Sequence, residues 1–197
     1  VSDVVASYSE NFIVESYSSE YLGEEALGEA ENLMEWSNAA VVGPGLSRPD
    51  VEVVKTLAGK STRKVIDADA IKHSIETAEN SVFTPHRGEF KQIEDELETV
   101  VENGNVVLRK GPEDRIYTEE GVESVTGGNP GMTVGGTGDV LAGVAGSLLA
   151  QGKSLGDAAV LGARINGRSG DLAHQELGNG LLATDLIEKI PRAMQNL

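Results

Sequence analysis

Short β-branched apolar runs alternate with amphipathic stretches along most of this chain, and this alternation constrains the fold more than any other feature. The runs expected to form strands are residues 12–14, 40–42, 64–66, 81–83 and 105–108. Each run is almost continuously apolar, which is typical of parallel strands buried on both faces. The pattern predicts an α/β fold with a mainly parallel central sheet and helices on both faces.

Helices are expected between these strands, where apolar residues recur at helical spacing. The stripes are Leu27–Met34, Val51–Leu57 and Phe90–Val101. We expect Ser47 to cap the second helix and Asn103–Gly104 to end the third.

The last third of the chain is predicted to be helical after a hairpin of residues 115–118 and 122–126. Residues 140–149 are nearly all apolar, which indicates a buried helix. Gly143 and Gly146 each weaken a helix by about 1 kcal/mol relative to alanine. We therefore expect both glycines to pack closely against the sheet or a ligand.

Length and composition limit the possible partners. The chain has 197 residues, a formal net charge of −16 and no cysteine. This length suits one core, so a single domain over residues 1–197 is expected. The charge argues against nucleic acid and anionic membranes as partners, because both would be repelled. With no cysteine, signal segment or long apolar run, we expect a cytoplasmic protein.

The acidic residues concentrate in residues 1–104. The simplest interpretation is a solvated surface that keeps the protein soluble. A sharper hypothesis is adaptation to high salt, because dissolved ions would screen the repulsion between these charges.

The strongest functional signal is the run Asn129–Asp139, NPGMTVGGTGD, which leads directly into the predicted buried helix. Its glycines let backbone N–H groups approach phosphate oxygens, and the helix start adds unpaired donors and a positive dipole end. The residues predicted to hold phosphate are Gly135, Gly136, Thr137 and Gly138.

Asp139 has two interpretations. It stabilises the first turn of the helix as an acidic residue, or it removes a proton from a substrate hydroxyl. A carboxylate beside bound phosphate is repelled, which favours the second role.

Four further loops follow predicted strands, where ligands bind in α/β sheets. They read GPGL (43–46), DADA (67–70), TPHRGE (84–89) and KG (110–111). Together with NPGMTVGGTGD, and in this order, they resemble NAD(P)H-hydrate dehydratases of the ribokinase-like superfamily. The similarity runs from about residue 1 to the end, where residues 180–187 also fit.

The resemblance implies a ribokinase-like fold in which Asp139 is the catalytic base. It places the hydrated dinucleotide at Gly45, His86, Asn129 and Asp139. The loop implied to hold the nucleotide, together with Gly135 to Gly138, consists of Lys110, Gly111, Pro112, Glu113 and Asp114.

Simpler interpretations stay open for several of these residues. Gly45 would then only serve a turn, His86 would only cap the following helix, and Lys110–Gly111 would only end a strand. Asp67 and Asp69 either border the same cleft or cap the short helix after them, and capping is the favoured alternative.

Glu89 matches the acidic position that organises magnesium in ribokinase-like enzymes, usually through water. The alternative is a carboxylate that stabilises the first turn of a helix.

The chain departs from the family pattern in three respects. We expect it to begin inside a longer protein and to lack roughly the first third of such a domain, with part of the substrate site. The interval from Glu89 to Lys110 is shorter than usual, and the loop 109–114 is more charged.

The resemblance implies a lyase that restores NAD(P)H from its hydrated form, with ADP or ATP and Mg²⁺. We expect ADP as donor because the acidic composition suggests an archaeon. We also expect a homo-oligomer and a fused or separate NAD(P)HX epimerase as partner. The alternatives are a ribokinase-like kinase of a vitamin-precursor alcohol and a non-catalytic dinucleotide-binding module.

Overall fold

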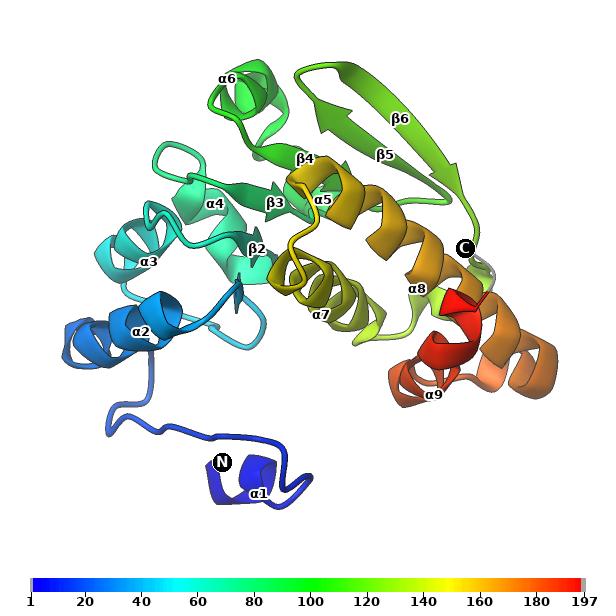
Figure 1. Cartoon of the computed structure of the whole chain (residues 1–197), viewed down its shortest axis with the longest axis horizontal. Helices are drawn as coiled ribbons and strands as arrows, with labels where there is room; N and C mark the ends of the chain where they lie inside the picture. Colours follow the sequence, from blue (N-terminus) through cyan, green and yellow to red (C-terminus); the bar gives the residue numbers. More distant parts are fainter. Residues whose placement is uncertain (1, 196–197) are drawn as a thin grey trace.

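A six-stranded sheet forms the centre of the computed structural model, which describes residues 2–195 (Figure 1). The strands lie side by side in chain order: β1 (Ala40–Val42), β2 (Lys64–Ile66), β3 (Ser81–Phe83), β4 (Val106–Arg109), β5 (Glu113–Thr118) and β6 (Gly121–Thr126). Strands β1 to β4 are parallel, and β5 and β6 continue the sheet as an antiparallel hairpin. The predicted α/β class, four of the five runs and the hairpin are confirmed.

Nine helices are described within residues 2–195, besides short 3-10 turns. They are α1 (Ser2–Ala6), α2 (Glu24–Trp36), α3 (Val51–Ala58), α4 (Ile71–Ser74), α5 (Arg87–Phe90), α6 (Leu97–Glu102), α7 (Thr137–Ala150), α8 (Leu155–Leu177) and α9 (Ala183–Met194). None of the helices in this part of the chain is both long and apolar enough to cross a bilayer.

Two apolar cores cover the two faces of the sheet. Val65, Val82 and Leu108 belong to the core that includes α7, α8 and α9. Their chain neighbours Ile66 and Val107 belong to the other core, with α3, α4, α5 and α6. Alternation along each strand therefore sends side chains into both cores, as expected for strands buried on both faces.

Helix α7 lies directly against the sheet. A Cβ atom added at Gly146 would lie 2.8 Å from Cγ2 of Val41, so glycine permits this close approach. A Cβ at Gly143 would meet no atom of the described residues within 4 Å. Close packing against the sheet is confirmed at Gly146. Gly143 does not pack against the sheet, because this residue faces outward, so the prediction of sheet packing is wrong there.

Lys64 is fully buried at the start of β2. Its Nζ donates to the backbone oxygens of Ala58, Lys60 and Glu79 at 3.0, 2.6 and 2.6 Å. Burial disfavours the charged amine and lowers the pKa of Lys64 to about 8. The three carbonyl groups hold this cation at the edge opposite to the functional loops.

The strand expected at residues 12–14 does not form. Phe12 and Ile13 are 55% and 76% exposed, and no strand within the described residues pairs with them. Figure 1 shows this segment as an extended arm that runs away from the sheet. A strand needs a neighbour for its backbone hydrogen bonds, and this arm has none in residues 2–195.

Two details of the predicted helices are also wrong. Asp50, rather than Ser47, caps α3, and its carboxylate accepts from the N–H groups of Glu52 and Val53. The single helix expected over residues 90–101 is instead α5, a turn and α6. The apolar residues of that stripe are still mostly buried, because the chain turns between them.

Candidate active site

The run Asn129–Asp139 leaves β6, makes a short 3-10 turn and enters α7 after Gly136. Gly136 has a φ of +94°, a left-handed conformation that favours glycine, and no side chain within residues 2–195 caps α7. The hydroxyl of Thr137 donates inward to the carbonyl oxygens of Met132 and Val134 at 2.8 and 3.1 Å. The first N–H groups of α7 are therefore available to an external anion.

Lys110 brings a positive charge to this helix start. It follows β4, and its backbone N–H donates to the carbonyl of Pro85 at 2.8 Å. A Cβ atom at Gly138 would lie only 3.2 Å from Nζ of Lys110, so the ammonium lies over the first turn of α7. Asp139 is the next residue in this turn, and its side chain is exposed. The structure therefore places a cation, unpaired N–H groups and a carboxylate together.

Asp67 holds the Lys110 ammonium in place. Oδ1 of Asp67 accepts a hydrogen bond from Nζ of Lys110 at 2.8 Å, and Asp67 is only 2% exposed. The interpretation of Asp67 as a helix cap is wrong, because its side chain makes no cap hydrogen bond and points to Lys110 instead. Asp69 lies within the short turn that follows β2.

His86 and Glu89 cap the short helix α5. Nδ1 of His86 accepts from the N–H groups of Gly88 and Glu89 at 2.8 and 3.1 Å, and Glu89 Oε2 accepts from the His86 N–H at 2.8 Å. The capping roles considered for both residues are thus present. The other oxygen of Glu89, Oε1, makes no hydrogen bond in this cap and lies 3.6 Å from Nε2 of His86, so a hydrated cation bound by this oxygen would lie beside His86. Within the described residues, no group of three or more acidic or histidine side chains forms a metal site.

Gly45 lies in the exposed loop after β1 with a φ of +77°, so the turn itself requires glycine. A Cβ atom at this position would meet no atom of the described residues within 4 Å. The loop therefore leaves open space at Gly45, as close approach of a ligand to the backbone requires.

The loop between β4 and β5 is a tight turn closed by Asp114. Oδ1 of Asp114 accepts from the N–H of Gly111 at 2.9 Å. Burial raises the pKa of Asp114, against the smaller opposing effects of this hydrogen bond and of Lys110. Gly111, Pro112 and Glu113 are exposed at the tip of the turn.

Asn129 uses its side chain within the loop. Its Oδ1 accepts from the N–H of Gly131 at 3.1 Å, and its Nδ2 donates to Oδ1 of Asp171 at 3.0 Å. Both ends of the amide therefore hold the approach to the anion site. Asp171 was not predicted as a functional residue, because it lies within the long helix α8 with no motif around it.

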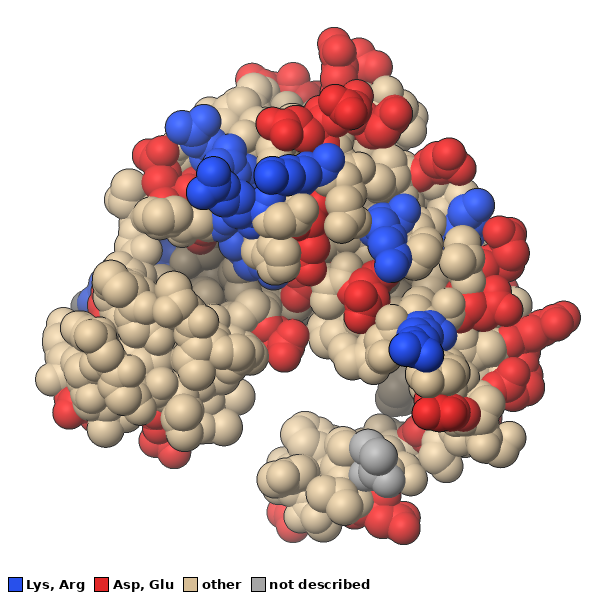
Figure 2. Space-filling view, turned by 180° about the vertical axis from the view of Figure 1, so that it is seen from behind, with Lys and Arg blue, Asp and Glu red and all other residues tan. Residues whose placement is uncertain are grey.

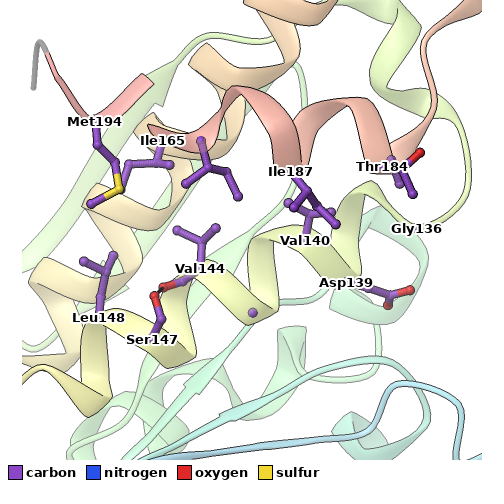
Figure 3. Close-up of a pocket in the computed structure, with 13 residues that line it drawn as sticks. Gly136, Asp139, Val140, Val144, Ser147, Leu148, Ile165, Thr184, Ile187 and Met194 are labelled. Carbon is purple, nitrogen blue, oxygen red and sulfur yellow. Dashed lines mark hydrogen bonds between the residues drawn. The ribbon is translucent and has the colours of Figure 1, made fainter. Parts of the chain in front are cut away.

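A groove of about 510 Å³ runs beside the anion site between α7 and α9. Figure 3 shows the apolar side chains of Val140, Val144 and Ile187 along this groove, with Asp139 at one end near Gly136. The lining is mostly apolar, and Gly136, one of the residues predicted to bind phosphate, borders the groove at that end.

Positive charge is concentrated locally on one face of the protein. Figure 2 shows Lys and Arg side chains gathered beside a hollow, while acidic side chains occupy much of the surrounding surface. In a protein of net charge −16, such a local basic area lowers the electrostatic cost of binding an anionic ligand.

With this geometry established, comparison with known proteins identifies the family. The model of the NAD(P)H-hydrate dehydratase family matches residues 2–192. The chain belongs to this family. The resemblance seen in the loop sequences is thereby confirmed.

Curated relatives of this dehydratase family cover nearly the whole chain. An ADP-dependent (S)-NAD(P)H-hydrate dehydratase of Haloterrigena turkmenica is 37% identical over 96% of this chain and 76% of the relative. A bifunctional NAD(P)H-hydrate repair enzyme of Archaeoglobus fulgidus is 37% identical over 97% of this chain. The chain spans 42% of that longer enzyme.

Solved structures confirm the ribokinase-like fold. A ribokinase-like superfamily protein of Enterococcus faecalis matches with a TM-score of 0.73 and 26% identity over 87% of this chain and 67% of its own. The ADP/ATP-dependent NAD(P)H-hydrate dehydratase of Bacillus subtilis, co-crystallised with ATP and Mg²⁺ and soaked with CoA, has a TM-score of 0.65. It is 26% identical over 80% of this chain and 66% of its own.

Proposed function

We propose that this protein dehydrates hydrated NAD(P)H, restoring NAD(P)H with cleavage of ADP. The observation that carries the proposal is the position of the Lys110 ammonium over Gly138, beside Asp139 in the uncapped first turn of α7. A phosphorylating dehydratase needs groups that bind the phosphate of its donor and a base that accepts the proton of the substrate hydroxyl. The family membership and the ADP-dependent relative support the choice of reaction and donor.

The nucleotide would bind along the loop from Lys110 to Asp114, with its terminal phosphate at Gly135–Gly138. The hydrated nicotinamide ring would lie at Asp139, near the loops of Gly45 and His86. The left-handed turn and open space at Gly45 support its assignment. Asn129 would act mainly by shaping the loop, since both ends of its amide are engaged there.

The reaction begins at the hydroxyl on carbon 6 of the reduced ring. Asp139 accepts the hydroxyl proton as the oxygen attacks the terminal phosphorus of ADP and AMP leaves. The N–H groups of Gly135–Gly138 and the Lys110 ammonium neutralise the transferring phosphoryl group. The ring nitrogen's lone pair then expels phosphate from carbon 6, and loss of a proton from carbon 5 completes NAD(P)H.

Magnesium would be held near the nucleotide phosphates through water by Glu89, whose Oε1 accepts no hydrogen bond in the cap of α5 and lies 3.6 Å from Nε2 of His86. When bound, the ion supplies additional positive charge at the phosphates. The dehydratase of Bacillus subtilis co-crystallised with ATP and Mg²⁺ supports this requirement.

The proposal also covers the setting of the enzyme. We place it in the cytoplasm, as a homo-oligomer whose chain forms a single domain over residues 1–197. An NAD(P)HX epimerase, fused or separate, would supply the epimer that the dehydratase uses. The bifunctional NAD(P)H-hydrate repair enzyme among the relatives supports this partnership.

The test is an assay of the full chain with hydrated NADH and either ADP, ATP or no nucleotide. We expect the near-ultraviolet absorbance of NADH to return fastest with ADP, with one AMP and one phosphate formed per NADH. Phosphorylation of a vitamin-precursor alcohol without NADH recovery would indicate a kinase instead. Binding of hydrated NADH without any turnover would indicate a non-catalytic module.

A further inference from the structure

One face of α8 supports the loop that follows β6 and leads to the predicted phosphate site at Gly135–Gly138. Gly167 and Gly170 lie three residues apart, so both are on the same side of the helix. A Cβ atom at Gly167 would lie 3.1 Å from backbone atoms of Gly127 and Gly128. A Cβ at Gly170 would lie 2.1 Å from Sδ of Met132. The loop therefore lies directly on the helix at two separate points.

Asp171 binds this loop through both of its carboxylate oxygens. Oδ2 accepts from the N–H of Gly128 at 3.2 Å, and Oδ1 accepts from Nδ2 of Asn129 at 3.0 Å. Asn129 in turn accepts from the N–H of Gly131 at 3.1 Å. Two hydrogen bonds thus connect α8 to the loop, and a third, within the loop, joins Asn129 to the turn that leads into Gly135–Gly138.

We propose that Asp171 is a positioning residue for the phosphate site. It does not reach Gly135–Gly138, but it fixes the segment from which these glycines extend. Donors that stabilise a transferring phosphoryl group must be placed before the reaction, and errors of about 1 Å can cost about 100-fold in rate. The inference rests on the proposed function, because it assigns that rate to the reaction at Asp139.

We call the two hydrogen bonds from the loop to Asp171 the clamp. The direction of these hydrogen bonds explains why a carboxylate is needed. Both partners of Asp171 are N–H donors, so both of its oxygens must accept. An asparagine at this position would turn its own NH₂ group towards one of them. In the Asp171→Asn variant two donors would therefore face each other, and one contact of the clamp would be lost.

The same geometry supplies a rescue. If Asn129→Asp is added to Asp171→Asn, the new asparagine can donate to the new aspartate and still accept from Gly128. The aspartate at 129 can still accept from Gly131. All three hydrogen bonds are restored with one of them reversed in direction.

The experiment compares the dehydratase activity of wild type, Asp171→Asn and the Asn129→Asp/Asp171→Asn double variant, with melting temperatures measured in parallel. We expect kcat to fall about 10- to 100-fold in the single variant, with a smaller change in the KM for hydrated NADH. The double variant should regain most of the lost kcat. Glu176→Gln is the matched control on α8, because its carboxylate only pairs with Lys189 at the surface, and its kcat should stay at the wild-type value.

Amide hydrogen exchange over residues 127–139 tests the clamp without any turnover. We expect faster exchange in Asp171→Asn and near wild-type exchange in the double variant. Wild-type rates of catalysis and exchange in the single variant would overturn the proposal, as would a double variant no better than the single one. A wild type without dehydratase activity would reject the proposed function, while the exchange data would still decide whether Asp171 positions the loop.

Discussion

At the scale of single residues, Asp67 and Lys110 determine the charge beside Gly138. Their side chains are 3% and 20% exposed, so the ion pair is largely removed from water. The sequence places both residues in loops after strands, but it does not predict that they pair. That contact depends on the order of β2, β3 and β4 in the sheet and on the direction of two side chains, neither of which has a local signal.

Replacing Lys110 with methionine should affect both activity and stability. We expect kcat/KM for the nucleotide to fall about 10- to 100-fold. This change corresponds to the loss of one charged hydrogen bond, which contributes about 1.5 to 3 kcal/mol. The buried Asp67 carboxylate would lose its partner, lowering the free energy of unfolding by about 3 kcal/mol. Adding Asp67→Asn should restore much of the stability but not the activity, as measured by chemical denaturation and steady-state kinetics. Recovery of activity in the double variant would contradict a direct role for Lys110. The control is Lys153→Met, which removes an exposed lysine elsewhere on the surface.

Lys64 gives a prediction for the pH dependence of stability. Its pKa is about 8 in the folded protein against an ordinary value of 10.5, so the unfolded chain binds more protons between these two values. The contribution of Lys64 to stability is therefore present above pH 10.5 and is lost as the pH falls to 8. The free energy of unfolding of wild type minus that of Lys64→Met should rise by up to about 3 kcal/mol over this window. If this difference in the free energy of unfolding does not change with pH, the three carbonyl groups offset the cost of burying the charged amine.

At the scale of elements, apolar spacing located the buried residues better than the ends of helices. It predicted α7 and most apolar contacts of residues 90–101, yet it missed the break between α5 and α6. His86 and Glu89 close a capping box within the first turn of α5, and the acidic residues 94–96 then occupy an exposed turn. The apolar spacing does not reveal this turn, because Ile93 is buried in the same core as the apolar residues of α5 and α6.

Gly143 and Gly146 of α7 form a matched pair for testing the packing of this helix. Gly146→Ala should lower the free energy of unfolding, because overpacking against Val41 costs about 1 to 3 kcal/mol and exceeds the gain in helix propensity of about 1 kcal/mol. Gly143→Ala meets no neighbour among the described residues and should raise the free energy of unfolding by about 0.5 to 1 kcal/mol. Thermal and urea unfolding of both variants would check the opposite signs. Equal effects would contradict the close packing at Gly146.

At the scale of the whole molecule, the sequence predicted the class of fold and the edge of the sheet at which the functional loops meet. It could not predict that residues 12–14 stay extended, because their strand propensity is satisfied only if another strand lies beside them. The left-handed Gly136 and the uncapped start of α7 support the phosphate chemistry that we propose at Gly135–Asp139. Asp171 lay outside that prediction, since its role arises from the packing of α8 on a distant loop.

The charge of −16 gives a prediction for the molecule in salt. If the acidic surface is an adaptation to high salt, the free energy of unfolding should rise from low to molar potassium chloride, because screening reduces the repulsion between carboxylates. Denaturation in urea at each salt concentration measures this change. Equal stability at both concentrations would show that the charge serves only solubility.

The most direct measurement is the recovery of NADH absorbance from hydrated NADH and ADP, compared between wild type and Asp139→Asn. The control is Asp157→Asn, which removes an exposed carboxylate near the start of α8. If Asp139 accepts the hydroxyl proton, wild type and Asp157→Asn recover NADH at the same rate. In Asp139→Asn, kcat then falls by about 10² to 10⁴. Near-normal turnover by Asp139→Asn would contradict the proposed mechanism.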